Sequence, residues 1–327
     1  MTDRLSMLHQ WLRVDLDMKS YDLACASEDA SFRRYYRVVS DGDSHIVMDA
    51  PPDKEDCRAF LDVTERLLRS GINVPIVYAQ DLQKGFLLLS DLGRSLYLDK
   101  LCDENADALY TDAIRSLVKM QIHAPLNNLP SYSESLLMQE MCLFRDWLLE
   151  RHCQISLNTT EQSQLNEVFQ LLSESATKQA QVFVHRDFHS RNLILNDRNP
   201  GVIDYQDAVT GPVSYDLVSL LKDCYIKWPL SKVDRWVQLY LEFLAEASDL
   251  QIGKDEFKRH FDLMGVQRHL KASGIFARLN HRDGKPDYLK DIPRTLSYIV
   301  DLSNDYPELK NLIALLQGKV IPGLGRA

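Results

Sequence analysis

The chain has 327 residues, 45% hydrophobic and 26% charged, which is long enough for two domains or for one bilobal unit with two cores. Its formal net charge of −9 argues against a nucleic-acid or anionic-membrane partner, because either would require a basic surface. No apolar run approaches the roughly 20 residues that span a bilayer, the N-terminal segment lacks the apolar core of a signal peptide, and the six cysteines show no C-x-x-C spacing. We therefore expect a cytoplasmic protein with free thiols.

The first ninety residues predict a small β-rich region with two helices. Apolar residues recur at helical spacing in residues 6–16. A second helix is expected in residues 53–70, with Asp53 as its N-cap and Gly71 after its last turn. Strands are expected in residues 27–39 after an initial turn, and in residues 45–49, 74–78 and 86–89.

Beyond Gly93 the pattern becomes mostly helical. Apolar stripes at helical spacing predict helices in residues 105–123, 135–152 and 160–179, and the last hundred residues are also expected to be helical. Three short apolar runs, in residues 182–184, 193–195 and 201–203, predict buried strands, with polar residues at their ends and in the loops between them.

These polar residues follow the order of a kinase catalytic loop. His185-Arg186-Asp187 and Asn192 match H-R-D-x-x-x-x-N, and Asp204 follows the next strand. In this order Asp187 accepts a hydrogen bond from the attacking hydroxyl, while Asn192 and Asp204 offer the oxygen ligands that Mg²⁺ prefers. Any one of these residues alone is equally typical of a turn-capping network, but their joint spacing favours phosphoryl transfer.

The same segment resembles the catalytic core of the aminoglycoside phosphotransferase (choline kinase-like) family, whose loop usually reads H-G-D-x-H-x-x-N and here reads HRDFHSRN. The strings HRDFHSRNLIL and GVIDYQDAVTGPVSYDLVSLLKDCY are similar to a bacterial branch that phosphorylates N-acetylmuramate and N-acetylglucosamine at the 1-position during cell-wall recycling. The resemblance implies an α+β, bilobal protein kinase-like fold with a small β-rich nucleotide-binding lobe in residues 1–91 and a larger, mostly helical catalytic and acceptor-binding lobe in residues 92–327. It also implies ATP and Mg²⁺ as cofactors and a sugar as the acceptor.

On the nucleotide side the sequence departs from the usual kinase pattern. The first turn has no G-x-G-x-x-G, and the strand in residues 45–49 reads HIVMD, without the lysine that pairs with phosphates in other kinases. The phosphate charge must then be met another way: Arg33, Arg34 and Lys54 are the nearby cations, and an arginine of the first turn is favoured. An extended backbone in residues 89–92 would meet the edge of the adenine. The candidate nucleotide-binding residues are Ser31, Arg33, Arg34, Ser90, Asp91 and Leu92.

The acceptor is less sharply indicated. His189 marks the small-molecule kinases within the resembling family, and no A-P-E segment follows Asp204, which argues against a protein substrate. Asp207 is either an acceptor contact or a turn residue, and Asp216 would cap a helix or, as in the resembling family, brace the catalytic loop. Basic residues near the C-terminus, among them Arg278, would suit a sugar carboxylate. An aminoglycoside, choline or amino-acid kinase and a nucleotide-binding pseudokinase remain as alternatives.

Overall fold

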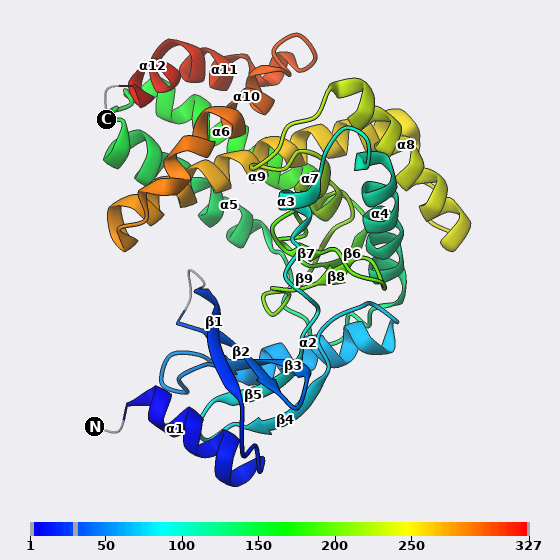
Figure 1. Ribbon diagram of the computed structural model, residues 1–327. Coiled ribbons are helices and arrows are strands. Elements are labelled where there is room, and N and C mark those ends of the chain that lie inside the picture. The colour runs from blue at the N-terminus through cyan, green and yellow to red at the C-terminus, as the bar shows by residue number, and fades with distance from the viewer. Residues whose placement is uncertain (1–2, 29–31, 326–327) are drawn as a thin grey trace. The chain divides into compact units, whose positions relative to one another are not determined.

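The computed structural model describes residues 3–28 and 32–325, and the chain forms two compact units (Figure 1). The first unit comprises Met1–Ser95 together with Ile194–Asp207, and the second comprises Leu96–Leu193 and Ala208–Ala327. The chain therefore returns to the first unit for one short segment, which contains Asp204. A sheet dominates the first unit and helices dominate the second, which confirms the predicted α+β class.

The first unit is built on a five-stranded antiparallel sheet with the order β1-β2-β3-β5-β4. Asp41 and Gly42, between β2 and β3, both have positive φ values, of 52° and 91°, as a two-residue hairpin turn requires. The strands are β1 (Asp22–Glu28), β2 (Arg34–Ser40), β3 (Asp43–Asp49), β4 (Val77–Asp81) and β5 (Phe86–Ser90).

Two helical segments accompany this sheet. α1 (Arg4–Gln10) continues as a π-helical turn, Trp11–Asp15, and places Trp11 against Phe86 of β5 with a ring separation of 5.6 Å. α2 (Cys57–Arg69) begins later than predicted, because Asp56 accepts the backbone N–H of Arg58 at 2.9 Å and caps the helix in place of Asp53.

The second unit is organised around the long helix α9 (Lys254–Asp283), which packs against α5, α6, α7 and α10 (Figure 1). At Gly274 a Cβ atom would lie 2.3 Å from the carbonyl carbon of Leu143, so glycine lets α9 and α5 approach closely. Its other helices are α3 (Tyr97–Lys100), α4 (Ala106–His123), α5 (Glu134–Leu143) with a π-helical extension (Phe144–His152), α6 (Thr159–Thr177), α7 (Tyr215–Leu221), α8 (Leu230–Ala247), α10 (Ile292–Val300), α11 (Lys310–Leu315) and α12 (Ile321–Leu324), with 3₁₀ turns at Pro286–Asp291 and Pro307–Leu309 and a π-helical turn at Leu316–Val320.

Two short strand pairs carry the segment with the kinase-like motif. β6 (Gln181–Val184) pairs antiparallel with β9 (Val209–Pro212) in the second unit. β7 (Leu193–Ile194) pairs with β8 (Gly201–Val202) where the chain passes into the first unit. These strands confirm the three short apolar runs as strands and place the polar motif in the loops after β6 and β8.

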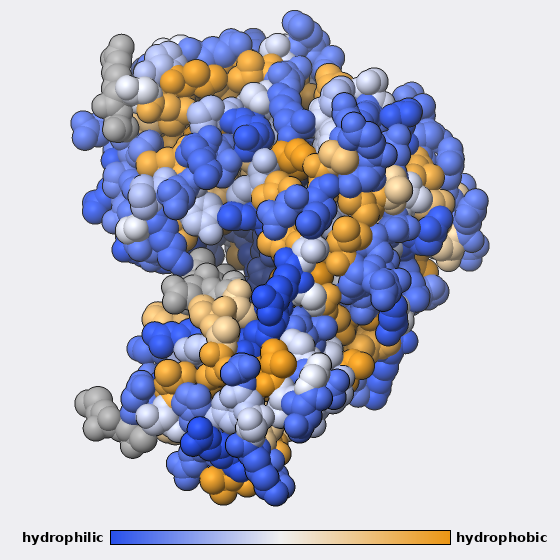
Figure 2. Space-filling view, in the orientation of Figure 1, coloured by the Kyte–Doolittle hydropathy of each residue, from blue (hydrophilic) through white to orange (hydrophobic). Residues whose placement is uncertain are grey.

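The surface seen in Figure 2 is mostly hydrophilic, with hydrophobic side chains in small areas between charged ones. Among the helices of residues 3–28 and 32–325, none combines the length and apolar character needed to cross a membrane.

Candidate active site

The loop after β6 holds the predicted catalytic residues in an unusual backbone conformation. Arg186 has a φ of 77°, a left-handed value that a non-glycine residue rarely adopts without support. The support comes from Asp216 of α7: its carboxylate oxygens accept the backbone N–H groups of His185 at 2.6 Å and Arg186 at 3.0 Å. Asp216 lies inside α7, after the N-cap residue Ser214, so its carboxylate braces the loop instead of capping the helix.

Asp216 is fully buried, and burial raises the pKa of its carboxyl to about 7. The two backbone N–H donors and the charge of Arg268 act in the opposite direction but do not cancel the cost of burying the carboxylate. The loop is therefore held by a group whose charged form is costly to keep in the folded state.

Asp187 keeps 41% of its side-chain surface exposed, so a substrate hydroxyl can reach its carboxylate. Partial burial acts to raise its pKa, but the charges of Lys271, Arg268 and other nearby cations outweigh that effect and hold the pKa at about 2. Asp187 is therefore ionised at neutral pH and can accept a hydrogen bond from a hydroxyl throughout the physiological range.

The cations around Asp187 are fixed by one buried carboxylate. Glu140 of α5 pairs with Arg186 at 2.5 Å and with Lys271 of α9 at 3.1 Å. It also accepts a short hydrogen bond from the hydroxyl of Tyr132, while Lys271 donates to the hydroxyl of Tyr215 at 3.0 Å. Burial acts to raise the pKa of Glu140, yet Lys271 and Arg186 lower it, so Glu140 is charged together with these two cations.

The remainder of the loop is also fastened to the second unit. Asn192 donates its Nδ2–H to the backbone carbonyl of Asp187 at 3.0 Å. This contact orients the amide, and an amide binds a cation through its oxygen. Ser190 donates both its N–H and its hydroxyl to Asp223, at 3.0 and 2.5 Å. The Nε2 atom of His189 lies 4.0 Å from Oδ1 of Asp187, and burial lowers the pKa of His189, so the ring is neutral at pH 7.

In the first unit, Asp204 also adopts a left-handed backbone conformation, with a φ of 66°. Gln206 donates its Nε2–H to Oδ1 of Asp204 at 2.8 Å. The intervening residue, Tyr205, anchors the turn: its ring stacks on Phe60 of α2 at 5.2 Å and its hydroxyl lies 2.9 Å from that of Thr64. The carboxylate of Asp204 is thus carried on a strained and well-anchored turn.

Arg33, one of the predicted phosphate-binding cations, lies in a largely buried ion pair. Its guanidinium pairs with Glu55 at 2.9 Å, and both side chains are largely buried, with 11% and 14% of their surface exposed. Burial acts to lower the pKa of Arg33, but Tyr35, Glu55 and the carboxylates of Asp207 and Asp204 raise it overall. Arg33 therefore interacts electrostatically with the loop that carries Asp204.

The other predicted nucleotide-binding residues include Ser31, Arg34 and Ser90. Ser31 lies outside the described residues. Arg34 is exposed at the first position of β2, opposite Asp49 of β3. The hydroxyl oxygen of Ser90 accepts the backbone N–H of Ile76 at 2.9 Å, which ties its side chain to the neighbouring segment.

Asp91 and Leu92 are also engaged within the first unit. Asp91 accepts hydrogen bonds from Arg37 at 2.5 and 3.0 Å and from the hydroxyl of Ser44 at 2.5 Å. Burial acts to raise the pKa of Asp91, but these donors hold it at about 2. The carbonyl of Leu92 accepts the Nδ2–H of Asn196 at 3.0 Å. The side chain of Asp91 thus links the end of β5 to β2 and β3. Adenine contacts at this segment remain a prediction.

Of the acceptor-side predictions, Asp207 is exposed in the first unit and His189 lies beside Asp187 in the second. Arg278 is half-buried on α9, one helical turn after Gly274, on the face that packs against α5. Its Nε atom has no hydrogen-bond partner among the described residues.

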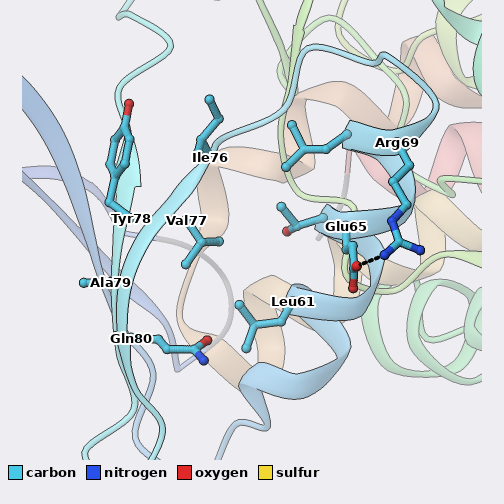
Figure 3. Close-up of a pocket in the computed structure, with 10 residues that line it drawn as sticks. Leu61, Glu65, Arg69, Ile76, Val77, Tyr78, Ala79 and Gln80 are labelled. Carbon is cyan, nitrogen blue, oxygen red and sulfur yellow. Dashed lines mark hydrogen bonds and ion pairs between the residues drawn. The ribbon is translucent and has the colours of Figure 1, made fainter.

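The first unit also contains a groove of about 490 Å³ between α2 and β4 (Figure 3). Val77 and Gln80 of β4 point toward α2, where Glu65 pairs with Arg69. None of the residues that line this groove belongs to the predicted site. We therefore base the site on the charged residues described above and not on cavity size.

Several functional residues were missed by the sequence analysis. Glu140, Lys271, Arg268 and Asp223 surround the catalytic loop but belong to no short motif. The available signal was weak: Glu140 lies in a mostly apolar stretch, where burial of a charged residue requires partners, but Arg268, Lys271 and Asp223 have polar or charged residues within two positions.

With the loop, its bracing carboxylates and the α+β fold described, the class of protein follows: a phosphotransferase with an alcohol acceptor. The chain belongs to the phosphotransferase enzyme family, whose model matches residues 23–251. Two relatives are called N-acetylmuramate/N-acetylglucosamine kinase. The one from Pseudomonas putida is 44% identical over 96% of both chains, and the one from Pseudomonas aeruginosa is 47% identical over 90% of this chain and 88% of its own.

The crystal structure of aminoglycoside phosphotransferase APH(2'')-Ib with bound ADP is similar in fold, with a TM-score of 0.60, 15% identity and coverage of 90% of this chain and 97% of that chain. The kinase-like fold and the family predicted from the sequence are both confirmed.

Proposed function

We propose that this protein transfers the γ-phosphoryl group of ATP to the anomeric hydroxyl of N-acetylmuramate or N-acetylglucosamine. The observation that carries the proposal is the state of Asp187: an accessible carboxylate with a pKa of about 2, on a loop held by Asp216 and by the Glu140 network. The names of the relatives supply the substrates, and their coverage extends over nearly the whole chain.

In this proposal Asp187 orients the sugar hydroxyl and accepts its proton as the phosphoryl group is transferred. The transition state of phosphoryl transfer is loose, so positioning and neutralisation of charge account for most of the catalysis. An anomeric hydroxyl is more acidic than an ordinary sugar alcohol, which suits a base with a low pKa. His189 is neutral and lies next to Asp187. It can donate a hydrogen bond to the sugar or accept one from it, while Asp187 accepts the proton of the reacting hydroxyl.

Asn192 and Asp204 are the residues we assign to Mg²⁺. Both carry oxygen donors. Asn192 lies in the loop after β6, where it donates to the backbone carbonyl of Asp187. Asp204 lies in the loop after β8, where it accepts a hydrogen bond from Gln206. Among residues 3–28 and 32–325 there is no group of three His, Cys, Asp or Glu side chains that could enclose a metal. Two protein ligands fit Mg²⁺, which usually keeps waters and completes its coordination with substrate phosphates.

We assign the phosphate-binding role of the absent strand lysine to Arg33. The Arg33–Glu55 pair has the same charges as the lysine–glutamate pair of other kinases, although both residues come from loops next to β2 and α2. A buried arginine next to a carboxylate keeps its charge and presents a planar donor fork to phosphate oxygens. The segment from Ser90 to Leu92 remains our prediction for the adenine contact.

The direct test is ADP release from Mg-ATP by the purified protein, with N-acetylmuramate, N-acetylglucosamine, glucose, choline, homoserine and kanamycin offered separately. We expect turnover with the two N-acetylated sugars and an acid-labile sugar 1-phosphate as product. Turnover with kanamycin or choline alone would overturn the substrate assignment and keep the catalytic residues. Binding of ATP without turnover of any acceptor would favour a pseudokinase.

A further inference from the structure

Arg191, in the catalytic loop between His189 and Asn192, has a distinctive environment. Its guanidinium lies over the ring of Tyr225, 4.4 Å from the ring centre, and over the ring of Tyr288 at 5.4 Å. Phe276 of α9 completes this aromatic group, at 5.7 Å from Tyr288 and 6.1 Å from Tyr225. Two aromatic faces therefore hold the long arginine side chain in a fixed position.

The same guanidinium lacks an acidic partner. Within residues 3–28 and 32–325, Arg191 forms no ion pair with a carboxylate, although it is half-buried. Burial acts to lower its pKa, and the hydroxyls of Tyr225 and Tyr288 raise it. A partly desolvated, immobilised cation without a counter-ion is a receptor for an anion, because the cost of ordering the side chain has already been met in folding.

Arg191 is also connected to the reaction centre through a short chain of contacts. The His189 ring packs edge-on against Tyr225 at 5.4 Å, and Nε2 of His189 lies 4.0 Å from the Asp187 carboxylate. Since all these residues lie in the second unit, the spacing between Arg191 and Asp187 is fixed by the unit itself. An acceptor held at Asp187 would have to extend past the rings of His189 and Tyr225 to place a second group at Arg191.

The other cations near this loop are less suited to bind a ligand anion. Lys271 pairs with Glu140, and Arg268, with 4% of its surface exposed, lies over Tyr215 and contributes to the low pKa of Asp187. Arg278 follows Phe276 by two residues, which is about 200° of helix rotation, so it lies on nearly the opposite face of α9 from the aromatic group. Arg278 therefore does not belong to the aromatic group that holds Arg191.

We propose that Arg191, held by Tyr225 and Tyr288, binds the carboxylate of an acidic N-acetylated sugar and thereby selects N-acetylmuramate over N-acetylglucosamine. The inference rests on the proposed sugar-kinase function. The two sugars differ by the lactyl ether at C3, which carries the carboxylate and lies two ring bonds from C1, the carbon that bears the reacting hydroxyl. A guanidinium can bind both oxygens of that carboxylate at once, which lysine cannot do with its single ammonium.

The experiment compares Arg191→Ala, Arg191→Lys and Arg278→Ala by kcat/KM for N-acetylmuramate, its neutral methyl ester and N-acetylglucosamine. In the unaltered protein the acid should be used better than the ester. In Arg191→Ala this preference should fall by about tenfold to a hundredfold, because only the acid loses a charged hydrogen bond. Arg191→Lys should keep part of the preference.

Three results would overturn the inference. If Arg191→Ala lowers kcat/KM equally for all three sugars, Arg191 acts on the loop or on the adjoining Asn192 and not on a carboxylate. If the preference is lost in Arg278→Ala and kept in Arg191→Ala, the basic residue of α9 binds the anion. If the unaltered protein uses none of the three sugars while it phosphorylates another acceptor, the proposed function fails and this inference fails with it. Thermal unfolding of each variant identifies losses that arise from misfolding.

Discussion

The catalytic loop of the second unit and the cation site of the first unit hold their charges in different ways. Around the catalytic loop, carboxylates from separate elements converge: Glu140 from α5, Asp216 from α7 and Asp223 after it. In the first unit, Arg33 pairs with Glu55, which lies two residues before α2. The proposed catalytic loop is thus braced by carboxylates from separate elements, whereas the cation assigned to phosphate pairs with a carboxylate next to α2 of its own unit.

This difference follows from what each site has to do. A general base must stay within a fraction of an ångström of the productive geometry, and a left-handed residue such as Arg186 persists only where several contacts impose it. A phosphate-binding arginine has to meet a nucleotide that arrives and leaves, and pairing with a carboxylate such as Glu55 keeps it charged. We therefore expect changes in the catalytic loop to affect turnover or folding, and changes at Arg33 to affect nucleotide affinity.

The largest effect should come from Asp187→Asn. The amide cannot accept the proton of the sugar hydroxyl, so kcat should fall by roughly three to four orders of magnitude, by analogy with other groups that act in the transition state. The fold and ATP binding should be preserved, because Asp187 is partly exposed and bears none of the contacts that brace the loop from α5 and α7. Steady-state turnover, circular dichroism and ATP titration test this, and near-normal turnover would remove Asp187 from the proposed role.

Glu140→Ala should destabilise the second unit, because Glu140 braces the catalytic loop. The substitution leaves Arg186 and Lys271 buried without their shared counter-ion, which typically costs about 3–5 kcal/mol in the free energy of unfolding. Urea unfolding of the second unit measures the loss. Glu174→Ala is the matched control, because Glu174 pairs with Lys178 on an exposed face of α6 and should leave stability almost unchanged. Equal stability of the two variants would contradict the bracing role of Glu140.

Arg33→Ala should weaken ATP binding and leave the catalytic loop intact. Loss of this cation should raise the KM for ATP about tenfold, equivalent to about 1.4 kcal/mol, with a smaller effect on kcat. Arg34→Ala should have a smaller effect, because Arg34 is exposed on β2. Glu55→Gln should also be milder, since it keeps the Arg33 charge. A KM for ATP that is unchanged in Arg33→Ala would show that another residue meets the phosphates.

The same contrast explains what could be predicted from the sequence. The candidate catalytic residues lie within a few positions of one another, so their spacing is visible in the sequence and their roles stay a prediction, while long amphipathic segments such as α4 and α6 were predicted nearly to their ends. Glu140 lies 46 positions from its partner Arg186, and no local pattern connects them. Strand β1 was missed because DLACASE lacks an apolar alternation. β4 begins at Val77 and not at residue 74, because Pro75 cannot donate a ladder hydrogen bond.

The effect of Asp216→Asn should depend on pH. The folded pKa of Asp216, about 7, lies above its ordinary value of 3.8, so the folded state binds this proton more tightly than the unfolded state. The resulting stability is fully present below about pH 4 and is lost as pH rises toward 7, with an upper bound of about 1.4 kcal/mol for each pH unit crossed.

The asparagine variant cannot titrate, and it loses one acceptor for the loop N–H groups at every pH. The stability advantage of the unaltered protein over Asp216→Asn should therefore shrink between pH 5 and pH 7, by about 1–2 kcal/mol, when both are unfolded in urea. A difference that stays constant over this range, or that grows as pH rises, would mean that Asp216 is ionised throughout and that its two backbone donors outweigh the cost of its burial.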